Sequence, residues 1–432
     1  MWTDEASTVM VAGARLGEIL ARVRELELVP PLYFLLVHFW MALFPDPLAA
    51  IRVFSLLCGV AALAFYYDLC ERLVPEQRTW CFALGCIASS WIHYSQDGRF
   101  YSLYLLLSLA AGRFALDLEE RSSPGRWLRF VLASAAGLCT HYFFGFLLLA
   151  LLARLLANAR RGPQLPAAIG AVGACAAAGL LLWAFFMRGQ MRGAVATNII
   201  TEPFTLRQLL SMSGEFLVDL SYFGFTVQGW VRVVGVAGLL LALYGALLSA
   251  RRPLLPILFF APLALVKVVE LSCGTPMTQA RYLAGLSPYY FLLAGRALGA
   301  LPRRLALASK ASLACVLIAG AAGYFASGRY VDPRLGFAAR AIRATVDPRT
   351  VIVHLDSYNY LPMRCYYLPE RAHYLIPSSA RDRALRLPGY SGILPKGVLA
   401  GMGRCLVYDP ARRLSPHALS EVPCRRLVDP GQ

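Results

Sequence analysis

The sequence is dominated by long apolar runs that follow one another with only short polar gaps between them. A helix needs roughly 20 residues to cross about 30 Å of hydrocarbon, and many of these runs have that length. One soluble core could not hide so much apolar side chain, because 58% of the 432 residues are hydrophobic and only 16% are charged. We therefore expect an α-helical polytopic membrane protein.

The apolar runs predict about ten spans in the region before residue 330. They are expected near residues 48–71, 79–95, 100–117, 127–141, 142–159, 166–187, 229–250, 254–272, 282–300 and 304–326. A long polar and aromatic segment, 188–228, separates the sixth run from the seventh and is expected to be an outer loop.

The positive charges predict the orientation of these spans. Lys and Arg total 42 against 25 Asp and Glu, a net charge of +17. They cluster in every second gap, at Arg72 and Arg78, Arg121 and Arg126, Arg160 and Arg161, Arg251 and Arg252, and Arg303, Arg304 and Lys310. By the positive-inside rule these gaps are cytoplasmic, so the other gaps and both termini face outward. No continuous basic stripe with interleaved aromatics is present, which argues against a nucleic-acid partner.

The first 47 residues are expected to lie in the outer interface and not to cross the membrane. Residues 9–29 have apolar positions at helical spacing with charged residues on the other face, the pattern of a helix lying in the interface plane. Residues 30–44, begun by Pro30 and Pro31, are too short for a span and predict an interfacial or re-entrant helix. The alternative is a short real span, with another segment failing to cross.

After the last span the composition changes, and residues 330–432 predict a small extracytoplasmic α/β domain. The stretch "RTVIVHLDSY" is typical of a buried strand, "RLGFAARAIRATV" before it has a helical pattern, and "MRCYYLP" after it is a second strand candidate. The expected division is therefore a membrane-embedded domain, 1–329, followed by this smaller domain.

Acidic residues in two outer segments could carry chemistry. Asp4 and Glu5 begin the amphipathic segment, so Asp4 is either a helix N-cap or a general base at the mouth of a membrane cavity. Asp97 and Arg99, in "HYSQDGRFYSLY", lie between two apolar runs. They either neutralise each other or provide a second acidic site residue and an anion contact.

Cations and aromatic side chains at other outer span ends are candidate substrate contacts. His141 and Tyr142 lie in "CTHYFFG", and Arg281 and Tyr282 lie in "TQARYLAGLSPYY". Each has a structural explanation, because interfacial aromatics and a single hydrogen-bonded His are common at such positions. The outward cations could instead bind an anionic head group such as a lipid phosphate.

Two further observations bear on the site. Lys267, within the run 254–272, is another candidate contact, although it could simply pair with Glu270. The eleven Cys residues are scattered, and none has a metal-binding spacing, so neither a metal site nor a disulfide framework is implied.

Taken in order, several motifs resemble those of a known family. They are "WTDEAST", "PPLYFLLVHFW", "IRVFSLLCG", "YSQDGRFYSLYLLL", "THYFFG" and "ARYLAGLSPYY". The series resembles the polytopic C-type glycosyltransferases of the bacterial family 39 type, akin to protein O-mannosyltransferases and aminoarabinose transferases. The resemblance runs from Trp2 to Ala300.

The resemblance implies roles for particular residues. The family's Asp-Glu motif, which supplies the catalytic base, matches Asp4 and Glu5, and its second acidic position matches Asp97. Its Arg-Tyr element matches Arg281 and Tyr282 and implies a contact with the donor phosphate. Family members carry a spanning helix ahead of the Asp-Glu motif, so we expect one N-terminal span to be missing from this sequence.

The resemblance also implies the reaction and the partners. It predicts transfer of a hexose or pentose from a polyprenyl-phosphate-linked donor to a lipid, glycan or protein acceptor, on the outer face of a bacterial inner membrane. A single attack at the anomeric carbon would invert its configuration. No cofactor is required by the residues, although two separated carboxylates permit a divalent cation without demanding one.

Two other functions are compatible with parts of the sequence. A transporter or lipid flippase would also use charged residues inside the membrane, but would line a path near the midplane with them. A receptor without catalytic activity would bind glycans through its 330–432 domain. A transferase should instead gather Asp4, Asp97 and Arg281 at the outer side.

Overall fold

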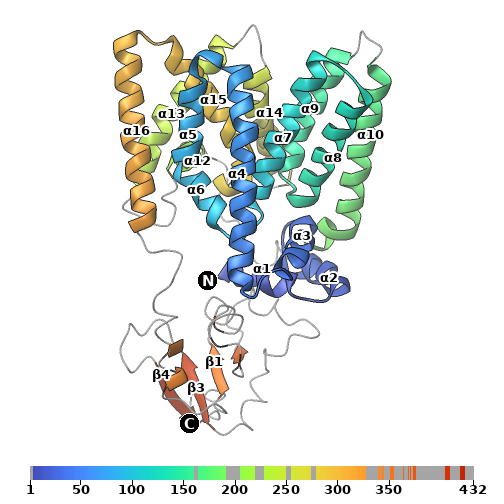
Figure 1. The fold of residues 1–432 in the computed structure, drawn as a ribbon, viewed down its shortest axis with the longest axis vertical. Coiled ribbons are helices and arrows are strands. Elements are labelled where there is room, and N and C mark those ends of the chain that lie inside the picture. Colours follow the sequence, from blue (N-terminus) through green and yellow to red (C-terminus); the bar gives the residue numbers. More distant parts are fainter. Residues whose placement is uncertain are drawn as a thin grey trace.

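A computed structural model shows a bundle of upright helices with smaller helices at one end (Figure 1). The structure describes residues 3–159, 164–190, 205–218, 228–249, 254–273 and 279–326, together with short segments between 339 and 423. The described helices are α1 (Thr3–Ala12), α2 (Leu16–Leu26), α3 (Leu32–Met41), α4 (Pro47–Leu73), η1 (Pro75–Gln77), α5 (Arg78–Ile87), α6 (Ser89–Gln96), α7 (Tyr101–Glu120), α8 (Pro124–Thr140), α9 (Phe144–Ala159), α10 (Leu165–Leu182), η2 (Trp183–Met187), α12 (Leu206–Leu217), α13 (Gln228–Leu248), α14 (Leu254–Cys273), η3 (Ala280–Leu286), α15 (Ser287–Ala300) and α16 (Arg303–Ala326).

Six helices in the described part of the chain are long and apolar enough to cross a membrane, fewer than the ten predicted. They are Pro47–Leu73, Tyr101–Glu120, Leu165–Gln190, Gly229–Leu248, Leu254–Ser272 and Arg303–Phe325. The fold is therefore that of an all-helical polytopic membrane protein, as predicted.

The other four predicted spans form shorter helices that stand beside the six (Figure 1). The run 79–95 is divided at Ala88, whose extended backbone separates α5 from α6. The helices α8 and α9 have 17 and 16 residues. The last of the four, α15, has 14 residues and follows the 3₁₀ segment η3.

Local sequence explains where several helices begin. Pro47 opens α4 behind Asp46, whose carboxylate accepts a hydrogen bond from the Leu48 N–H at 2.9 Å. Pro124 opens α8 behind Ser123, which caps the Arg126 N–H. A side-chain acceptor followed by proline at the first helical position satisfies an otherwise unpaired N–H and sets the backbone angle that a helix needs.

The N-terminal region forms α1, α2 and α3 beside the end of the bundle where α4 begins (Figure 1). The single interfacial helix predicted for residues 9–29 is wrong in one respect, because the chain breaks near Gly13 into α1 and α2. The ten residues of α3 extend only about 15 Å, which is too short to cross a bilayer. A short helix begun by proline was predicted here.

The helix α12 occupies part of the segment that was predicted to be a long outer loop, 188–228. Thr205 caps its first turn through the Gln208 N–H. Its buried residues include Met212 and Phe216, and it packs against α13 and α6. The remainder of the predicted loop, 191–204 and 219–227, lies outside the described residues.

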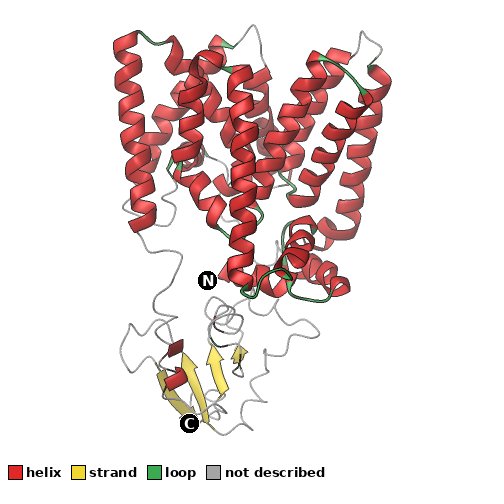
Figure 2. Ribbon diagram, viewed as in Figure 1, coloured by secondary structure: helices red, strands yellow, loops and turns green. Residues whose placement is uncertain are grey.

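The C-terminal region contains a four-stranded sheet, drawn in yellow in Figure 2. Its strands are β1 (Val351–His354), β2 (His373–Leu375), β3 (Arg404–Tyr408) and β4 (Leu419–Pro423), in the order β2-β1-β3-β4. The pairs β1/β2 and β1/β3 are parallel, and β3/β4 is antiparallel. The strand predicted in "RTVIVHLDSY" is β1, whereas the candidate "MRCYYLP" lies mostly outside the described residues.

Candidate functional site

The end of the bundle beside α1 gathers charged and aromatic side chains from distant parts of the sequence. We call this end of the molecule the α1 end. It is built from α1, the start of α4, the turn between α6 and α7, the turn between α8 and α9, and η3. Most of the residues predicted to form a site lie here.

Glu5 is fully buried and forms a bidentate ion pair with Arg52 of α4. The Arg52 Nε and Nη2 donate to the two Glu5 carboxylate oxygens, each at 2.8 Å. Glu5 Oε1 also accepts from the Gly98 backbone N–H at 3.3 Å. These contacts fix α1 to α4 and to the turn before α7, so the Glu5 carboxylate is engaged in holding three elements together.

Arg99 forms a second buried pair, with Glu27 at the end of α2. Its Nη2 donates to Glu27 Oε2 at 3.0 Å, and its Nη1 contacts Glu27 Oε1, Thr8 Oγ1 and the Asp4 carbonyl oxygen at 3.2 to 3.3 Å. The negative charges of Glu27 and Asp4 raise the pKa of Arg99 above its ordinary value, although burial opposes this. Arg99 therefore remains a cation and ties α1 and α2 to the start of α7.

Asp4 is partly buried and lies in the first turn of α1, which begins at Thr3, so Asp4 is not the N-cap. Arg281, Arg99 and Asp4 all act electrostatically on the Tyr101 side chain at the start of α7. The structure thus brings the first acidic residue of the chain close to a cation that follows it by more than half the sequence.

Arg281 stands over an aromatic side chain of its own segment. Its guanidinium carbon lies 5.1 Å from the centroid of the Tyr282 ring, and its Nε donates to Gln279 Oε1 at 2.8 Å. Both side chains are only partly buried. Its Nη2 also lies 3.4 Å from the Tyr282 hydroxyl oxygen. A guanidinium is the side chain best shaped to bind a planar pair of anionic oxygens.

His141 completes the aromatic part of the α1 end. It stacks on Tyr104 with ring centroids 4.7 Å apart, and it contacts Tyr282 at 5.8 Å. Burial, with a contribution from the charge of Arg281, lowers the pKa of His141 to about 3. Its Nδ1 accepts from the Phe143 backbone N–H at 3.2 Å. The ring is therefore neutral, and its proton is on Nε2.

Asp97 is buried at the end of α6, one turn from His93. The distance from His93 Nε2 to the nearer carboxylate oxygen of Asp97 is 3.8 Å. The Asp97 N–H continues the α6 hydrogen-bond pattern, and its carbonyl oxygen accepts from the Arg99 N–H at 2.7 Å. Asp97 thus shapes the turn that carries Arg99, and the Arg99 side chain pairs with Glu27.

Two further predicted site residues, Tyr142 and Lys267, lie in other surroundings. The Tyr142 hydroxyl donates to Gln190 Oε1 at 2.6 Å, and Gln190 Nε2 donates to the carbonyl oxygens of Val23 and Val29. Tyr142 therefore connects the α8–α9 turn to α2 through this glutamine. Lys267 and Glu270 lie near the end of α14, where Lys267 is partly buried and Glu270 is buried.

Sequence reasoning missed both partners of the buried ion pairs, Arg52 and Glu27. Arg52 lies in the motif "IRVFSLLCG", a few residues into an apolar helix. A charge at such a position needs a partner, so an ion pair at Arg52 could have been predicted. Glu27 ends an amphipathic segment rich in charges and gave no such signal.

No metal site is visible in the described part of the chain, where no three His, Cys, Asp or Glu side chains gather in a group that could hold an ion. The role of a divalent cation stays a prediction.

The first half of the chain has a sequence match to a known family. Residues 29–187 match the family model described as dolichyl-phosphate-mannose-protein mannosyltransferase. This range contains Arg52, Asp97, Arg99 and His141, while Asp4 and Arg281 lie outside it. A comparison with curated proteins gives no match.

A crystal structure of ArnT from Cupriavidus metallidurans in the apo state superposes on 93% of this chain and 87% of its own, with a TM-score of 0.62 and 12% sequence identity. The fold is that of ArnT. The crystal structure of the same ArnT bound to undecaprenyl phosphate covers 94% of this chain and 88% of its own, with a TM-score of 0.59 and 12% identity. The ArnT-like fold and the family match agree with the resemblance drawn from the motifs.

Proposed function

We propose that this protein transfers a sugar from a polyprenyl-phosphate-linked donor to an acceptor at the α1 end. The observation that carries the proposal is the cluster at the α1 end, where Arg99 contacts Asp4 and the Tyr282 ring lies beside Arg281 and His141, in a chain with the ArnT fold. An acid, a partly exposed guanidinium and aromatic rings are the groups that such a reaction needs. The family match over 29–187 supports the same reaction class.

In this proposal, each group has a separate task. Asp4 takes the proton from the attacking hydroxyl or amine of the acceptor. Arg281 binds the donor phosphate and stabilises the negative charge that the phosphate gains as its bond to the anomeric carbon of the sugar breaks. His141, neutral and protonated on Nε2, offers a hydrogen bond to an oxygen atom without adding charge. One attack opposite the departing phosphate inverts the anomeric carbon.

The proposed roles of Glu5 and Arg99 are to position these groups. Each is engaged in a buried bidentate pair, and Arg99 contacts the Asp4 carbonyl oxygen directly. Together the two pairs hold the first turn of α1, and with it the Asp4 carboxylate, against α4 and α7. Because both Glu5 carboxylate oxygens accept hydrogen bonds from Arg52, we assign Glu5 the positioning role and Asp4 the role of base.

A transporter is disfavoured by the same geometry. Such a protein would line a path through the middle of the bilayer with its charged residues. Asp4, Arg99 and Arg281 instead gather where α7 begins, at one end of the bundle.

The first test measures transfer from defined polyprenyl-phosphate sugars to acceptors in membranes that contain the protein. Asp4→Asn should reduce the rate by about 100-fold to 10,000-fold, the usual effect of removing a general base, while thermal stability stays near that of the wild type. Arg281→Lys keeps the charge but loses the planar fork, so it should weaken apparent donor affinity.

Two results would contradict these assignments. Transfer by Asp4→Asn at the wild-type rate would move the base elsewhere, to Glu5 or Asp97. A donor titration that is unchanged in Arg281→Ala would remove Arg281 from phosphate binding. A wild-type protein that moves the lipid across the membrane but transfers no sugar would favour the transporter.

A further inference from the structure

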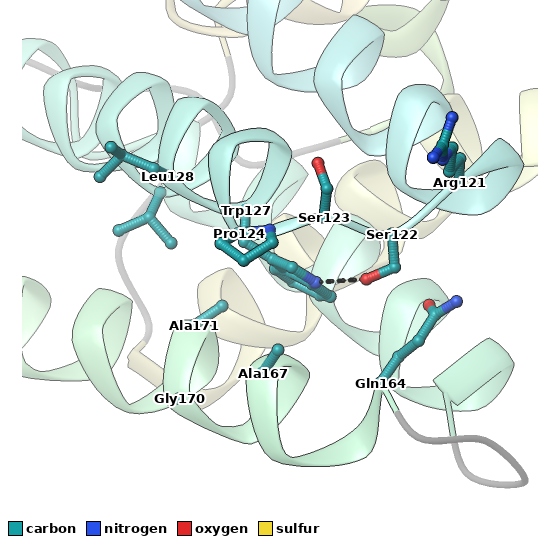
Figure 3. Close-up of a pocket in the computed structure, with 11 residues that line it drawn as sticks. Arg121, Ser122, Ser123, Pro124, Trp127, Leu128, Gln164, Ala167, Gly170 and Ala171 are labelled. Atoms are coloured by element: carbon teal, nitrogen blue, oxygen red, sulfur yellow. Dashed lines mark hydrogen bonds between the residues drawn. The ribbon is translucent and has the colours of Figure 1, made fainter.

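A groove opens at the end of the bundle opposite the α1 end. It has a volume of about 820 Å³ and lies between the α7–α8 connection, α8 and the start of α10. Figure 3 shows its lining residues, with Arg121 and Gln164 at one part of the groove and Leu128 at another. The twenty residues of α7 separate the groove from Arg99 and the proposed site by about 30 Å.

The lining of the groove divides into a polar part and an apolar part. Arg121, Ser122, Ser123 and Gln164 provide the polar part, and the Trp127 indole N–H donates to Ser122 Oγ at 2.9 Å. The apolar part is formed by Leu128, Val131, Ala167, Gly170 and Ala171. A polar head beside an apolar channel matches the shape of a phospholipid.

Charge at the groove favours a negatively charged head group. Residues 121–201 contain no Asp or Glu, so no acidic side chain comes from α8, α9 or α10. The two acids that end α7 are engaged, because Glu119 pairs with Arg154 and Glu120 pairs with Arg72. The Arg121 side chain is exposed at the mouth of the groove.

The groove also faces the bilayer. Only 17% of the most apolar window of Leu165–Gln190 is buried, so the described part of the protein leaves most of this apolar surface open to the bilayer. Leu128 and Ile169 are 58% and 57% exposed. Small residues on α10, Ala167, Gly170 and Ala171, leave room there for an acyl chain.

We propose that this groove binds one anionic glycerophospholipid of the surrounding bilayer, with its phosphate on Arg121 and the adjacent serines and one acyl chain between α8 and α10. The occupant is a lipid and not a free anion, because the apolar part of the groove would remain uncovered by phosphate alone. The proposal does not depend on sugar transfer.

Native mass spectrometry of the full-length protein, with dioleoyl phosphatidylglycerol and dioleoyl phosphatidylcholine as probes, tests the proposal. Phosphatidylglycerol should be retained more strongly than phosphatidylcholine. Arg121→Gln should weaken phosphatidylglycerol binding by about fivefold, the contribution of one cation near an anionic head group. Arg129→Gln is the matched control, since Arg129 is an exposed cation on α8 that does not line the groove.

A second pair of variants tests the acyl-chain part of the groove without changing charge. A side chain added at Gly170 or at Gly173 meets no neighbouring atom within 4 Å, so both glycines of α10 accept substitution. Only Gly170 lines the groove. Gly170→Leu should therefore reduce retention of phosphatidylglycerol, whereas Gly173→Leu should not.

Several outcomes would overturn the proposal. They are equal retention of the two lipids, equal loss in Arg121→Gln and Arg129→Gln, or wild-type retention in Gly170→Leu. Complete displacement of phosphatidylglycerol by inorganic phosphate would show an anion site in place of a lipid site. Retention of the lipid in excess phosphate is the expected result.

Discussion

At the scale of single residues, the adjacent carboxylates Asp4 and Glu5 have different surroundings. Successive side chains of a helix point about 100° apart, so neighbours in sequence face different partners. Glu5 is directed at Arg52 and the Gly98 N–H, whereas Asp4 is partly exposed within electrostatic reach of Arg99 and Tyr101. The sequence could place both acids at a site but could not divide their tasks, because the division depends on where α4 and α7 pack.

The first prediction at this scale concerns stability. Glu5→Gln keeps the shape of the side chain but removes the charge that neutralises Arg52. Breaking a buried pair costs about 3 to 5 kcal/mol, and the lower end applies here because the Arg52 side chain is 27% exposed. Thermal denaturation in detergent should show the loss. Asp4→Asn, the same chemical change one residue earlier, is the control and should leave the melting temperature nearly unchanged; the reverse pattern would exchange the roles assigned to the two acids.

A second prediction follows from the lowered pKa of His141, which is about 3 in the folded protein. An unfolded chain protonates this ring near pH 6.5, so between those values the unfolded state binds more protons and stability falls as pH decreases. From pH 7.5 to pH 5 the loss should reach about 2 kcal/mol, at 1.36 kcal/mol for each pH unit below 6.5.

His141→Asn removes this titration while keeping an acceptor for the Phe143 N–H. The difference between wild type and His141→Asn in the free energy of unfolding should therefore shrink by that amount on acidification, because the other histidines contribute equally to both proteins. A difference that is independent of pH would mean that the ring is already charged in the folded state.

At the scale of elements, α13 shows how the helices approach one another closely. A Cβ atom added at Gly245 would meet the carbonyl oxygen of Leu293 on α15, and one added at Gly238 would meet the Tyr290 hydroxyl on the same helix. Toward α12, Gly235 would meet the Leu210 carbonyl oxygen. Small residues at such crossings let two helix backbones touch inside a membrane.

A matched pair of alanine variants tests this crossing. Gly245→Ala should destabilise the bundle by about 1 to 3 kcal/mol, the cost of overpacking, because the obstructing atom belongs to a backbone and cannot turn away. Gly229→Ala on the same helix meets no atom within 4 Å and should be neutral or slightly stabilising, because alanine favours a helix over glycine. Equal melting temperatures for the two variants in the same detergent would show that α13 and α15 are not in close contact.

Exposure to lipid helps to explain which helix lengths could be predicted. The run that forms α16 agrees well with its helix, and only 11% of its most apolar window is buried. In contrast, α15 is surrounded by protein over Ser287–Leu298, so the thickness of the bilayer does not set its length. The break at Ala88 has no proline or glycine beside it and left no signal in the sequence. The helix α12 was taken for a loop, although its Thr205 cap and its apolar residues at helical spacing were signals that could have been followed.

At the scale of the whole molecule, the charges at the two ends of the bundle differ in kind. The helix α4 begins at the α1 end, where Arg52 meets Glu5, and ends near Arg72, and α7 runs in the same direction from Arg99 to Arg121 (Figure 1). The basic gaps that the structure describes, at Arg72 and Arg78, Arg121 and Arg126, and Arg303 and Arg304, therefore lie at the groove end. At the α1 end, Arg52 and Arg99 are paired and Arg281 is stacked. The pattern of charges could predict this division, but not the pairs, since a partner distant in sequence is fixed only by the fold.

The last prediction is the orientation that follows from this division. By the positive-inside rule, the basic groove end should lie on the cytoplasmic side. The α1 end should then face outward and present Asp4 to a donor in the outer leaflet.

Gly17 and Gly125 offer a test of this orientation, because both positions have open space for a side chain and they lie at opposite ends of the bundle. Gly17→Cys should react with a membrane-impermeant maleimide in intact cells, and Gly125→Cys should react only after the membrane is opened, with the wild-type protein as the background for its own cysteines. A reporter fused after Gln432 should also report the outside. Labelling of Gly125→Cys in intact cells, with Gly17→Cys protected, would invert the protein and place the proposed transfer on the cytoplasmic face.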